Sequence, residues 1–314
     1  MVYILTLPEG SGHVAHFVKH FGRRHSRTIA EATYGEFLGR REIPSGVYIF
    51  ADRDRMTPDQ RAIACRLWDT LAVYSNRVKL LNNPHHQWGR YELLQALYQR
   101  GVNDFRVWRI DELPDDISFP VFVRKENDHH GPRSGLLHSM EEVWRALAAL
   151  ALEGVDPKNM LVCQYLETVE EDGIYRKYGA WRIGEKVYGQ YLILERRWEK
   201  SHGERVRTEE SKAANQNYFC QNPHAELLRP YFQMAGVEYG RMDYSFSKGR
   251  LQIWEINDNA FLAAPILAHY IAETGISKYL DGLETLQREV SSENMLSVDF
   301  PWTEWGSKEL GAEK

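Results

Sequence analysis

Two acidic side chains and one amide in the last third of the chain are spaced so that they could hold a metal ion together. Asp243 lies within 240–246, an apolar segment typical of a β-strand, and Glu255 and Asn257 lie within 251–257, a second such segment. Residues two apart in a strand point to the same face, so Glu255 and Asn257 share one. A turn between the two segments would place Asp243 opposite them. Two carboxylates and an amide oxygen suit Mg²⁺, which takes a few protein oxygens and completes its shell with phosphates and water.

An arginine lies beside these three residues. Arg241 is two residues before Asp243 and points to the same face, where it could meet a phosphate or an acyl-phosphate oxygen. The alternative is a solvated hairpin face with ordinary surface acids. The flanking Tyr, Phe, Ile and Trp residues argue against that alternative, because they indicate a sheet whose other face is buried. Spacing alone leaves both interpretations open.

The composition is that of an ordinary globular chain. With 314 residues, 43% hydrophobic and 26% charged, it is long enough for about two domains. The net charge of −5 argues against non-specific binding of nucleic acid, which needs a basic surface. Three widely separated cysteines form no disulfide framework and indicate a reducing, cytoplasmic compartment. No apolar run approaches the ~20 residues that span a bilayer, so we expect no membrane segment.

The first 115 residues alternate between strand and helix patterns. Thr57 before Pro58 marks a helix start, and Gly101 marks a helix end. This alternation predicts a doubly wound α/β domain. The expected strands cover 2–7, 46–50 and 77–81, and the expected helices cover 13–20, 58–74 and 88–100.

The residues after 115 combine helices with strand pairs that are typical of antiparallel sheets, so this part has α+β character. A polar segment at 199–217 is expected to be mobile or lid-like, and a charged tail ends the chain. The expected strands cover 119–123, 160–166, 175–183, 187–194, 240–246 and 251–257, and the expected helices cover 140–153, 222–235 and 263–274.

The hairpin resembles the magnesium signature of the ATP-grasp superfamily, as in D-alanine–D-alanine ligase and the ribosomal-protein glutamate ligases. The matching residues are Arg241-Met-Asp243 and, twelve residues after Asp243, Glu255-Ile-Asn257. Other parts of that family occur here in the expected order: a strand, a phosphate-covering loop, a helix, a hinge strand and the hairpin. The resemblance covers about residues 75–275 and, more weakly, the α/β domain before them.

Two basic positions resemble those that contact the nucleotide phosphates in that family. Arg90 stands where the family usually has a lysine before its central domain. Segment 119–125 resembles the P-V-x-V-K strand, and strand register favours Arg124 as the phosphate contact while Lys125 stays open. Loop 126–135 resembles the loop that covers the phosphates. Arg90 and Arg124 depart from the family's lysines, although arginine also pairs with phosphate, and does so bidentately.

Segment 162–167 resembles the hinge strand that reads adenine and holds the ribose. A glutamine stands where the family often has glutamate, and its amide oxygen could still accept from adenine. The hinge residues that the resemblance implies are Gln164, Tyr165, Leu166 and Glu167, with Glu170 and Glu171 as alternatives to Glu167 for the ribose.

Further cations lie in 175–182 and 195–200. One interpretation is a solvated strand pair with cation–π contacts. The resemblance instead implies a basic wall for the γ-phosphate and a substrate carboxylate, formed by Arg182, Arg196 and Lys200.

The resemblance implies an α/β protein in which an N-terminal pre-ATP-grasp domain precedes a two-lobed ATP-grasp domain with antiparallel sheets. The expected boundaries are 1–115 for the first domain, 116–195 for the small lobe with phosphate loop and hinge, 196–295 for the large lobe with the metal site, and 296–314 for a C-terminal tail.

The resemblance also implies an activity. It is that of an ADP-forming carboxylate–amine ligase, which makes an amide bond through an acyl phosphate with ATP and Mg²⁺, or Mn²⁺. Arg241, Arg182 and Arg196 would act in catalysis. The alternatives are a phosphotransferase with the same site and, because lysines are replaced, a nucleotide-binding protein without turnover. The expected partners are small-molecule or peptide carboxylates and amines and a second copy of the chain, with no nucleic acid and no membrane.

Overall fold

The computed structural model describes residues 1–21, 28–127, 131–198, 205–260, 273–290 and 295–298. Within these ranges the strands form a parallel sheet, two larger antiparallel sheets and one short strand pair. No helix in the described ranges is long and apolar enough to cross a membrane.

A four-stranded parallel sheet occupies the N-terminal part of the chain, with the strand order β2-β1-β4-β5. The strands predicted at 2–7, 46–50 and 77–81 are confirmed as β1, β4 and β5. Strand β2 was not predicted, because Ala and Glu interrupt its apolar pattern. The bounds are Val2–Thr6 (β1), Ile29–Thr33 (β2), Gly46–Phe50 (β4) and Val78–Leu81 (β5), with helices His13–Phe21 (α1), Tyr34–Leu38 (α2) and Pro58–Ala72 (α3).

The start of α3 shows why local sequence sets a helix boundary. Thr57 Oγ1 accepts a hydrogen bond from the backbone N–H of Gln60 at 3.2 Å, and Gln60 Oε1 accepts one from the N–H of Thr57 at 2.9 Å. Pro58 occupies the first helical position, where a missing N–H does no harm. The N-cap predicted at Thr57 is therefore confirmed.

A three-stranded antiparallel sheet, in the order β6-β8-β7, forms a second layer with helix α5. Val143, Leu147 and Leu150 of α5 pack against apolar residues of β7 and β8. Strand β6 lies after residue 106 and joins this sheet, although we assigned its residues to the first domain. The bounds are Val107–Arg109 (β6), Val121–Lys125 (β7), Met160–Gln164 (β8) and Met140–Leu152 (α5); α4, Arg90–Gln99, precedes β6.

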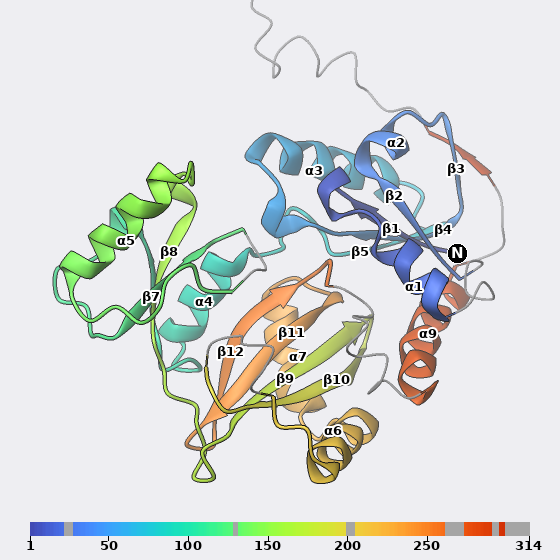
Figure 1. The fold of residues 1–314 in the computed structure, drawn as a ribbon. Helices are drawn as coiled ribbons and strands as arrows, with labels where there is room; N and C mark the ends of the chain where they lie inside the picture. Colours follow the sequence, from blue (N-terminus) through green and yellow to red (C-terminus); the bar gives the residue numbers. More distant parts are fainter. Residues whose placement is uncertain (22–27, 128–130, 199–204, 261–272, 291–294, 299–314) are drawn as a thin grey trace, which may run out of the picture.

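A four-stranded antiparallel sheet, in the order β10-β9-β11-β12, forms the third layer. The two predicted hairpins are confirmed, and β9 pairs with β11 to join them. Residues 175–195, which we assigned to the small lobe, therefore share a sheet with the metal-site hairpin. Figure 1 shows α4 between this sheet and the smaller one. The bounds are Tyr175–Ile183 (β9), Lys186–Glu195 (β10), Tyr239–Ser247 (β11) and Arg250–Asn257 (β12).

Part of the segment expected to be mobile is a packed helix. Helix α6, Glu209–Gln221, is capped at its N-terminus by Thr208, whose side chain accepts from the N–H of Ser211. Asn215 is buried, and its Oδ1 accepts from the N–H of Leu192 on β10 at 2.6 Å. The lid prediction is thus wrong for 209–217, because a polar side chain of this helix makes a hydrogen bond to the backbone of the edge strand β10. Residues 199–204 lie outside the described residues.

Helix α9, Glu273–Arg288, joins the parallel sheet to the large antiparallel sheet. Its Leu280, Leu283 and Leu286 share a core with Val2 and Ile4 of β1, among other residues of both sheets. The helix predicted at 263–274 lies almost wholly outside the described residues. Strand β13, Met295–Ser297, pairs with β3, Glu42–Pro44, so the chain returns to its N-terminal part.

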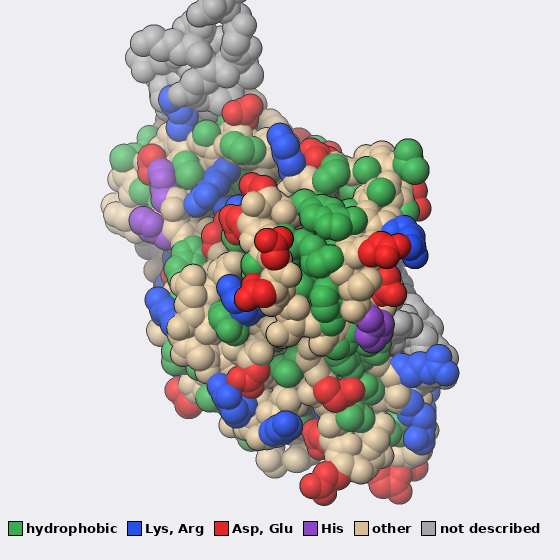
Figure 2. Space-filling view, turned by 90° about the vertical axis from the view of Figure 1, so that its left-hand side faces the viewer, with side chains coloured by type: hydrophobic (Ala, Val, Ile, Leu, Met, Phe, Trp, Pro, Cys, Tyr) green, Lys and Arg blue, Asp and Glu red, His purple; other side chains and the backbone are tan. Residues whose placement is uncertain are grey.

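Helix α7 covers Ala225–Met234. Figure 2 shows the face of the molecule that carries α5 and the three-stranded sheet. Basic and acidic side chains of the described residues are interspersed over it and hydrophobic ones gather near its centre, so the described residues form no continuous basic surface on this face.

Candidate active site

The β11–β12 hairpin places the predicted metal ligands on one face. Asp243 is paired with Glu255, and Arg241 with Asn257, across the two strands. The carboxylates of Asp243 and Glu255 and the amide of Asn257 are all buried. The geometry inferred from spacing is therefore present, and metal binding itself stays a prediction.

Three donors surround the carboxylate of Asp243. Tyr191 Oη donates to Oδ1 at 2.7 Å, and Arg241 Nε donates to the same oxygen at 2.8 Å. Lys177 Nζ lies 3.0 Å from Oδ2. Burial alone would raise the pKa of Asp243, but Arg241 and Lys177 together hold it below its ordinary value. Asp243 is therefore ionised and oriented before any ligand binds.

Two arginines hold the other carboxylate. Arg90 Nη2 donates to Glu255 Oε2 at 2.5 Å, and Arg124 Nη2 donates to the same oxygen at 3.2 Å. Arg90 is fully buried at the start of α4, and its Nη1 also donates to the carbonyls of Lys125 and Glu126. Arg90 thus connects the metal-site hairpin to the end of β7 and to the predicted phosphate loop.

Four cations surround these two carboxylates. Arg90 and Arg124 pair with Glu255, while Lys177 and Arg241 pair with Asp243. Cations in a buried site favour a polyanion, because low polarity strengthens its attraction to them. The arrangement can therefore stabilise a phosphate chain.

A cavity of 160 Å³ lies beside this charged group. Arg124, Lys177 and Glu255 line it together with aromatic side chains. The ring of Trp198 lies 5.4 Å from that of Phe122 and 5.3 Å from that of Tyr165. Flat apolar walls next to cations suit a nucleotide, whose base can stack while its phosphates meet positive charge.

Some of the predicted nucleotide residues line this cavity and others do not. The cavity is lined by Arg124, Tyr165 and Leu166. It is not lined by Lys125, in agreement with the strand register, which favoured Arg124. Gln164 lies outside the lining, and its Oε1 accepts from the N–H of Arg106, next to β6, at 3.2 Å; its contact with adenine stays a prediction. Glu167 is exposed outside the lining and accepts from the N–H of Val169.

Two of the predicted catalytic arginines also lie elsewhere. The buried guanidinium of Arg182 donates to the carbonyls of Gly184 and Val237, at 2.8 and 2.9 Å, and supports the β9–β10 turn. Arg196 is exposed outside the cavity, and its neighbour Arg197 lines the cavity instead. Strand alternation defines two faces of β9 without saying which one is functional, and it does not apply to Arg196, which follows the end of β10. The catalytic roles of Arg182 and Arg196 stay predictions. Lys200 lies outside the described residues.

Lys177 and Tyr191 are not among the site residues predicted from the sequence. One signal was available: Gly179 is opposite Asp243 on the neighbouring strand. A Cβ at Gly179 would lie 2.6 Å from the ring of Tyr191, so only glycine lets that tyrosine reach Asp243. A glycine inside a strand is a reason to look for such a close approach.

The donor set fits a hard cation that shares its shell with a substrate. In the described part of the chain, no three His, Cys, Asp or Glu side chains are placed to hold a metal. Asp243 and Glu255 supply two carboxylates, and the Oδ1 of Asn257, which accepts from the N–H of Asn259 at 2.9 Å, supplies an amide oxygen. Mg²⁺ is commonly held by one or two carboxylates and substrate phosphates, so these residues could hold it.

No protein-family model matches the sequence, and no curated protein matches it significantly. Solved structures match nearly the whole chain. D-alanine–D-alanine ligase from Bacillus anthracis, in complex with ATP, is 12% identical with a TM-score of 0.52, covering 91% of this chain and 97% of its own. The enzyme of the same name from Helicobacter pylori is 13% identical with a TM-score of 0.51, covering 91% and 98%. A RimK domain ATP-grasp protein from Sphaerobacter thermophilus is 11% identical with a TM-score of 0.50, covering 93% and 99%.

The chain therefore has the ATP-grasp fold, as the hairpin signature indicated. The N-terminal parallel sheet and the two antiparallel sheets agree with the predicted α/β class.

Proposed function

We propose that the protein is an ATP-dependent carboxylate–amine ligase that forms ADP and an amide bond. The observation that carries the proposal is the hairpin pair of Asp243 and Glu255, each held by two cations beside an aromatic cavity. The similar folds of two D-alanine–D-alanine ligases support it.

ATP would bind with its base in the aromatic cavity near Tyr165 and Leu166. Its phosphates would meet Arg124, Arg90 and Lys177, which would then exchange part of their contact with the carboxylates for contact with phosphate oxygens. Glu167 stays the proposed ribose ligand and would have to turn from its present contact.

Asp243, Glu255 and Asn257 would hold Mg²⁺, with Mn²⁺ as a substitute of similar ligand preference. When bound, the ion would neutralise phosphate charge.

The proposed reaction has two steps. An oxygen of the substrate carboxylate attacks the γ-phosphorus, and the bond to the β-γ bridging oxygen breaks, giving an acyl phosphate and ADP. The amine nitrogen then attacks the acyl carbon, phosphate leaves and the nitrogen loses a proton. Arg241 would stabilise the negative charge that develops on the acyl phosphate, so positioning and electrostatics supply the catalysis.

The substrates are proposed to be a small-molecule or peptide carboxylate and an amine. The domain boundaries near residues 115, 195 and 296 stay predictions, and strands on both sides of the first two share a sheet. The cytoplasmic location and a homodimer also stay predictions.

The test uses the full chain with Mg-ATP, a panel of carboxylates and hydroxylamine as trap. A ligase should release ADP and phosphate and form a hydroxamate, because hydroxylamine intercepts the acyl phosphate. A stable phosphorylated product without hydroxamate would point to a phosphotransferase. Tight ATP binding without release for any carboxylate would point to a binding protein.

Replacing Glu255 by Ala should abolish Mg-dependent turnover. The matched control is Glu289→Ala, which removes an exposed carboxylate paired with Lys79. Equal activity in the two variants would contradict the assignment of the metal site.

A further inference from the structure

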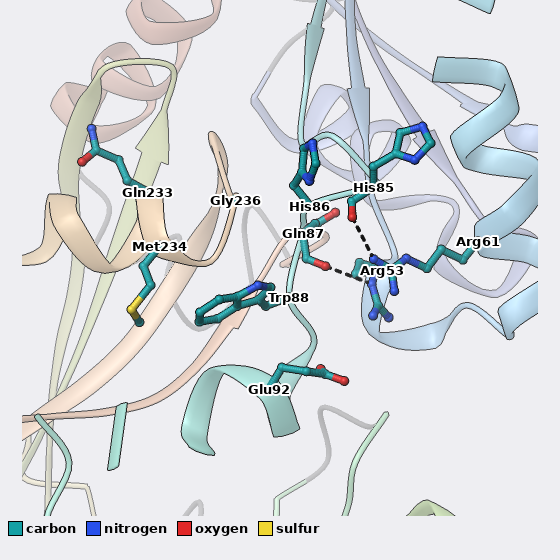
Figure 3. Close-up of a pocket in the computed structure, with 10 residues that line it drawn as sticks. All are labelled: Arg53, Arg61, His85, His86, Gln87, Trp88, Glu92, Gln233, Met234 and Gly236. Atoms are coloured by element: carbon teal, nitrogen blue, oxygen red, sulfur yellow. Dashed lines mark hydrogen bonds between the residues drawn. The ribbon is translucent and has the colours of Figure 1, made fainter. Parts of the chain in front are cut away.

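A second cavity, of about 450 Å³, shares no lining residue with the candidate active site. It lies between the start of α4, the end of α7 and the segment that leads into α3 (Figure 3). Its size is within the range of ligand pockets, about 300–1,000 Å³. It has a charged part and an apolar part.

Two guanidinium groups converge in the charged part. Figure 3 shows the side chain of Arg61 extending from α3 toward Arg53. Backbone carbonyls hold both: Arg53 Nε donates to Gln87 at 3.3 Å, and Arg61 Nε donates to Pro84 at 2.9 Å. Burial lowers the pKa of Arg61, and the charge of Arg53 lowers it further. The protein therefore holds two like charges close together.

No acid in the described ranges forms an ion pair with either arginine. Glu92 lines the same cavity, but its Oε2 accepts from the N–H of Gly89 at 3.0 Å and its Oε1 lies 3.6 Å from Arg109. The charges of Asp54 and Glu92 act on Arg53 and Arg61 without ion-pair contact. The two guanidinium groups therefore form a fork that matches the oxygens of a phosphate or a carboxylate. A bound oxyanion would also remove the repulsion between Arg53 and Arg61.

The apolar part of the cavity contains Trp88 and Met234. The backbone N–H of Trp88 donates to the carbonyl of Ala235 at 3.0 Å, so the loop that carries the indole is tied to the end of α7. An indole beside a thioether makes a wall for a flat apolar group. The distribution of groups thus fits a molecule with an oxyanion at one end and a flat ring at the other.

We propose that this cavity binds a small molecule that carries a phosphate or carboxylate group on a flat apolar body. The anion pairs with Arg53 and Arg61, and the body packs against Trp88 and Met234. This proposal does not depend on the proposed ligase activity, because it rests on a separate set of residues.

The experiment titrates the full chain by calorimetry with phenyl phosphate, benzoate and phenol. Phenyl phosphate and benzoate present the two anionic groups on one ring, and phenol has the ring without the anion. Saturable 1:1 binding of either anion, with no binding of phenol, is the expected result. The anion that binds more tightly shows whether the cavity prefers a phosphate or a carboxylate group.

Four variants locate the binding. Arg53→Gln and Arg61→Gln should each weaken it at least about tenfold, since each removes a charge-assisted contact. Arg66→Gln, on the same helix but outside the cavity lining, and Arg124→Gln, in the other cavity, should leave it unchanged. If Arg61→Gln unfolds the chain, Arg61→Lys should fold and keep measurable binding through its charge.

Three results would overturn the proposal. They are the absence of saturable binding of both anions below about 10 mM, equal binding of phenol, and loss of binding in Arg124→Gln but not in Arg53→Gln.

Discussion

The ammonium group of Lys177 on β9 lies 3.0 Å from Oδ2 of Asp243 on β11. The carboxylate is 2% exposed and the lysine side chain 27% exposed, so the lysine connects a buried acid to the cavity. It stabilises the charge of Asp243 now and would be placed to meet a phosphate when ATP binds. The pair therefore relates the predicted metal site to the predicted phosphate site.

Lys177→Met should weaken the binding of Mg-ADP at least about tenfold, because one charge-assisted phosphate contact is lost. Lys177→Arg should retain most of the affinity. Lys186→Met, exposed at the start of β10 in the same hairpin, is the matched control. Titration calorimetry measures the three affinities, and a Lys177→Met affinity equal to that of Lys186→Met would show that this lysine does not contact the nucleotide.

Glu255→Gln should destabilise the chain even without a ligand. The side chain of Arg90 is fully buried, and both Arg90 and Arg124 donate to one oxygen of Glu255. Removing the charge leaves two guanidinium groups near each other without their carboxylate, at a cost of about 3 kcal/mol in the free energy of unfolding.

Urea denaturation at neutral pH measures this loss. Glu289→Gln breaks an exposed pair with Lys79 and should change the free energy of unfolding by less than about 1 kcal/mol. Similar losses in the two variants would mean that the buried pairing contributes little.

The hairpin could be predicted from sequence because its information is local. Asp243, Glu255 and Asn257 lie on two strands joined by one turn, and a period of two fixes which side chains share a face. Arg90 and Arg124 were found for a different reason, since a resemblance supplied their positions and the structure brings both to Glu255.

The residues that sequence reasoning missed depend on pairings between distant segments. Lys177 contacts Asp243 only because β9 pairs with β11, and alternation within β9 gave Arg182 and Lys177 opposite faces without ranking them. Gln164 is oriented by Arg106, next to the three-residue strand β6, which is too short to give a pattern. Tertiary pairing therefore decided the positions that local patterns left open.

Trp198 should report nucleotide binding. The free volume of 160 Å³ is below the range typical of ligand pockets, which begins at about 300 Å³, and the Trp198 ring packs on Phe122 and Tyr165 inside the lining. A bound base would therefore have to displace or stack on this indole, and either event changes its emission.

Mg-ADP should produce a saturable change in tryptophan fluorescence that Trp198→Phe largely abolishes. Trp144→Phe, an exposed side chain on α5, should keep the change. An undiminished signal in Trp198→Phe would place the base away from this residue.

Asp54 should make the free energy of unfolding fall as the pH rises, whereas an acid in a salt bridge makes it rise. It is buried, its Oδ1 accepts from the N–H of Arg90 at 3.2 Å, and burial raises its pKa from 3.8 to about 6 although Arg90 and Arg53 oppose the rise. The folded state therefore holds this proton more tightly than the unfolded chain does. Its contribution to stability is complete below pH 3.8 and is lost as the pH rises toward 6.

Asp54→Asn keeps the oxygen that accepts from Arg90 and removes the titration. Relative to the wild type, the free energy of unfolding of this variant should rise by up to about 3 kcal/mol between pH 4 and pH 7, as the shift in pKa requires. Burial and the charge of Asp54 raise the pKa of Asp258 to about 7, so the rise in the free energy of unfolding of Asp54→Asn includes relief of the repulsion between these two acids. Urea denaturation across this range measures the difference, with Asp59→Asn on the exposed first turn of α3 as control. A difference that does not change with pH would mean that Asp54 is already ionised in the folded chain at pH 4, with Arg90 and Arg53 outweighing its burial.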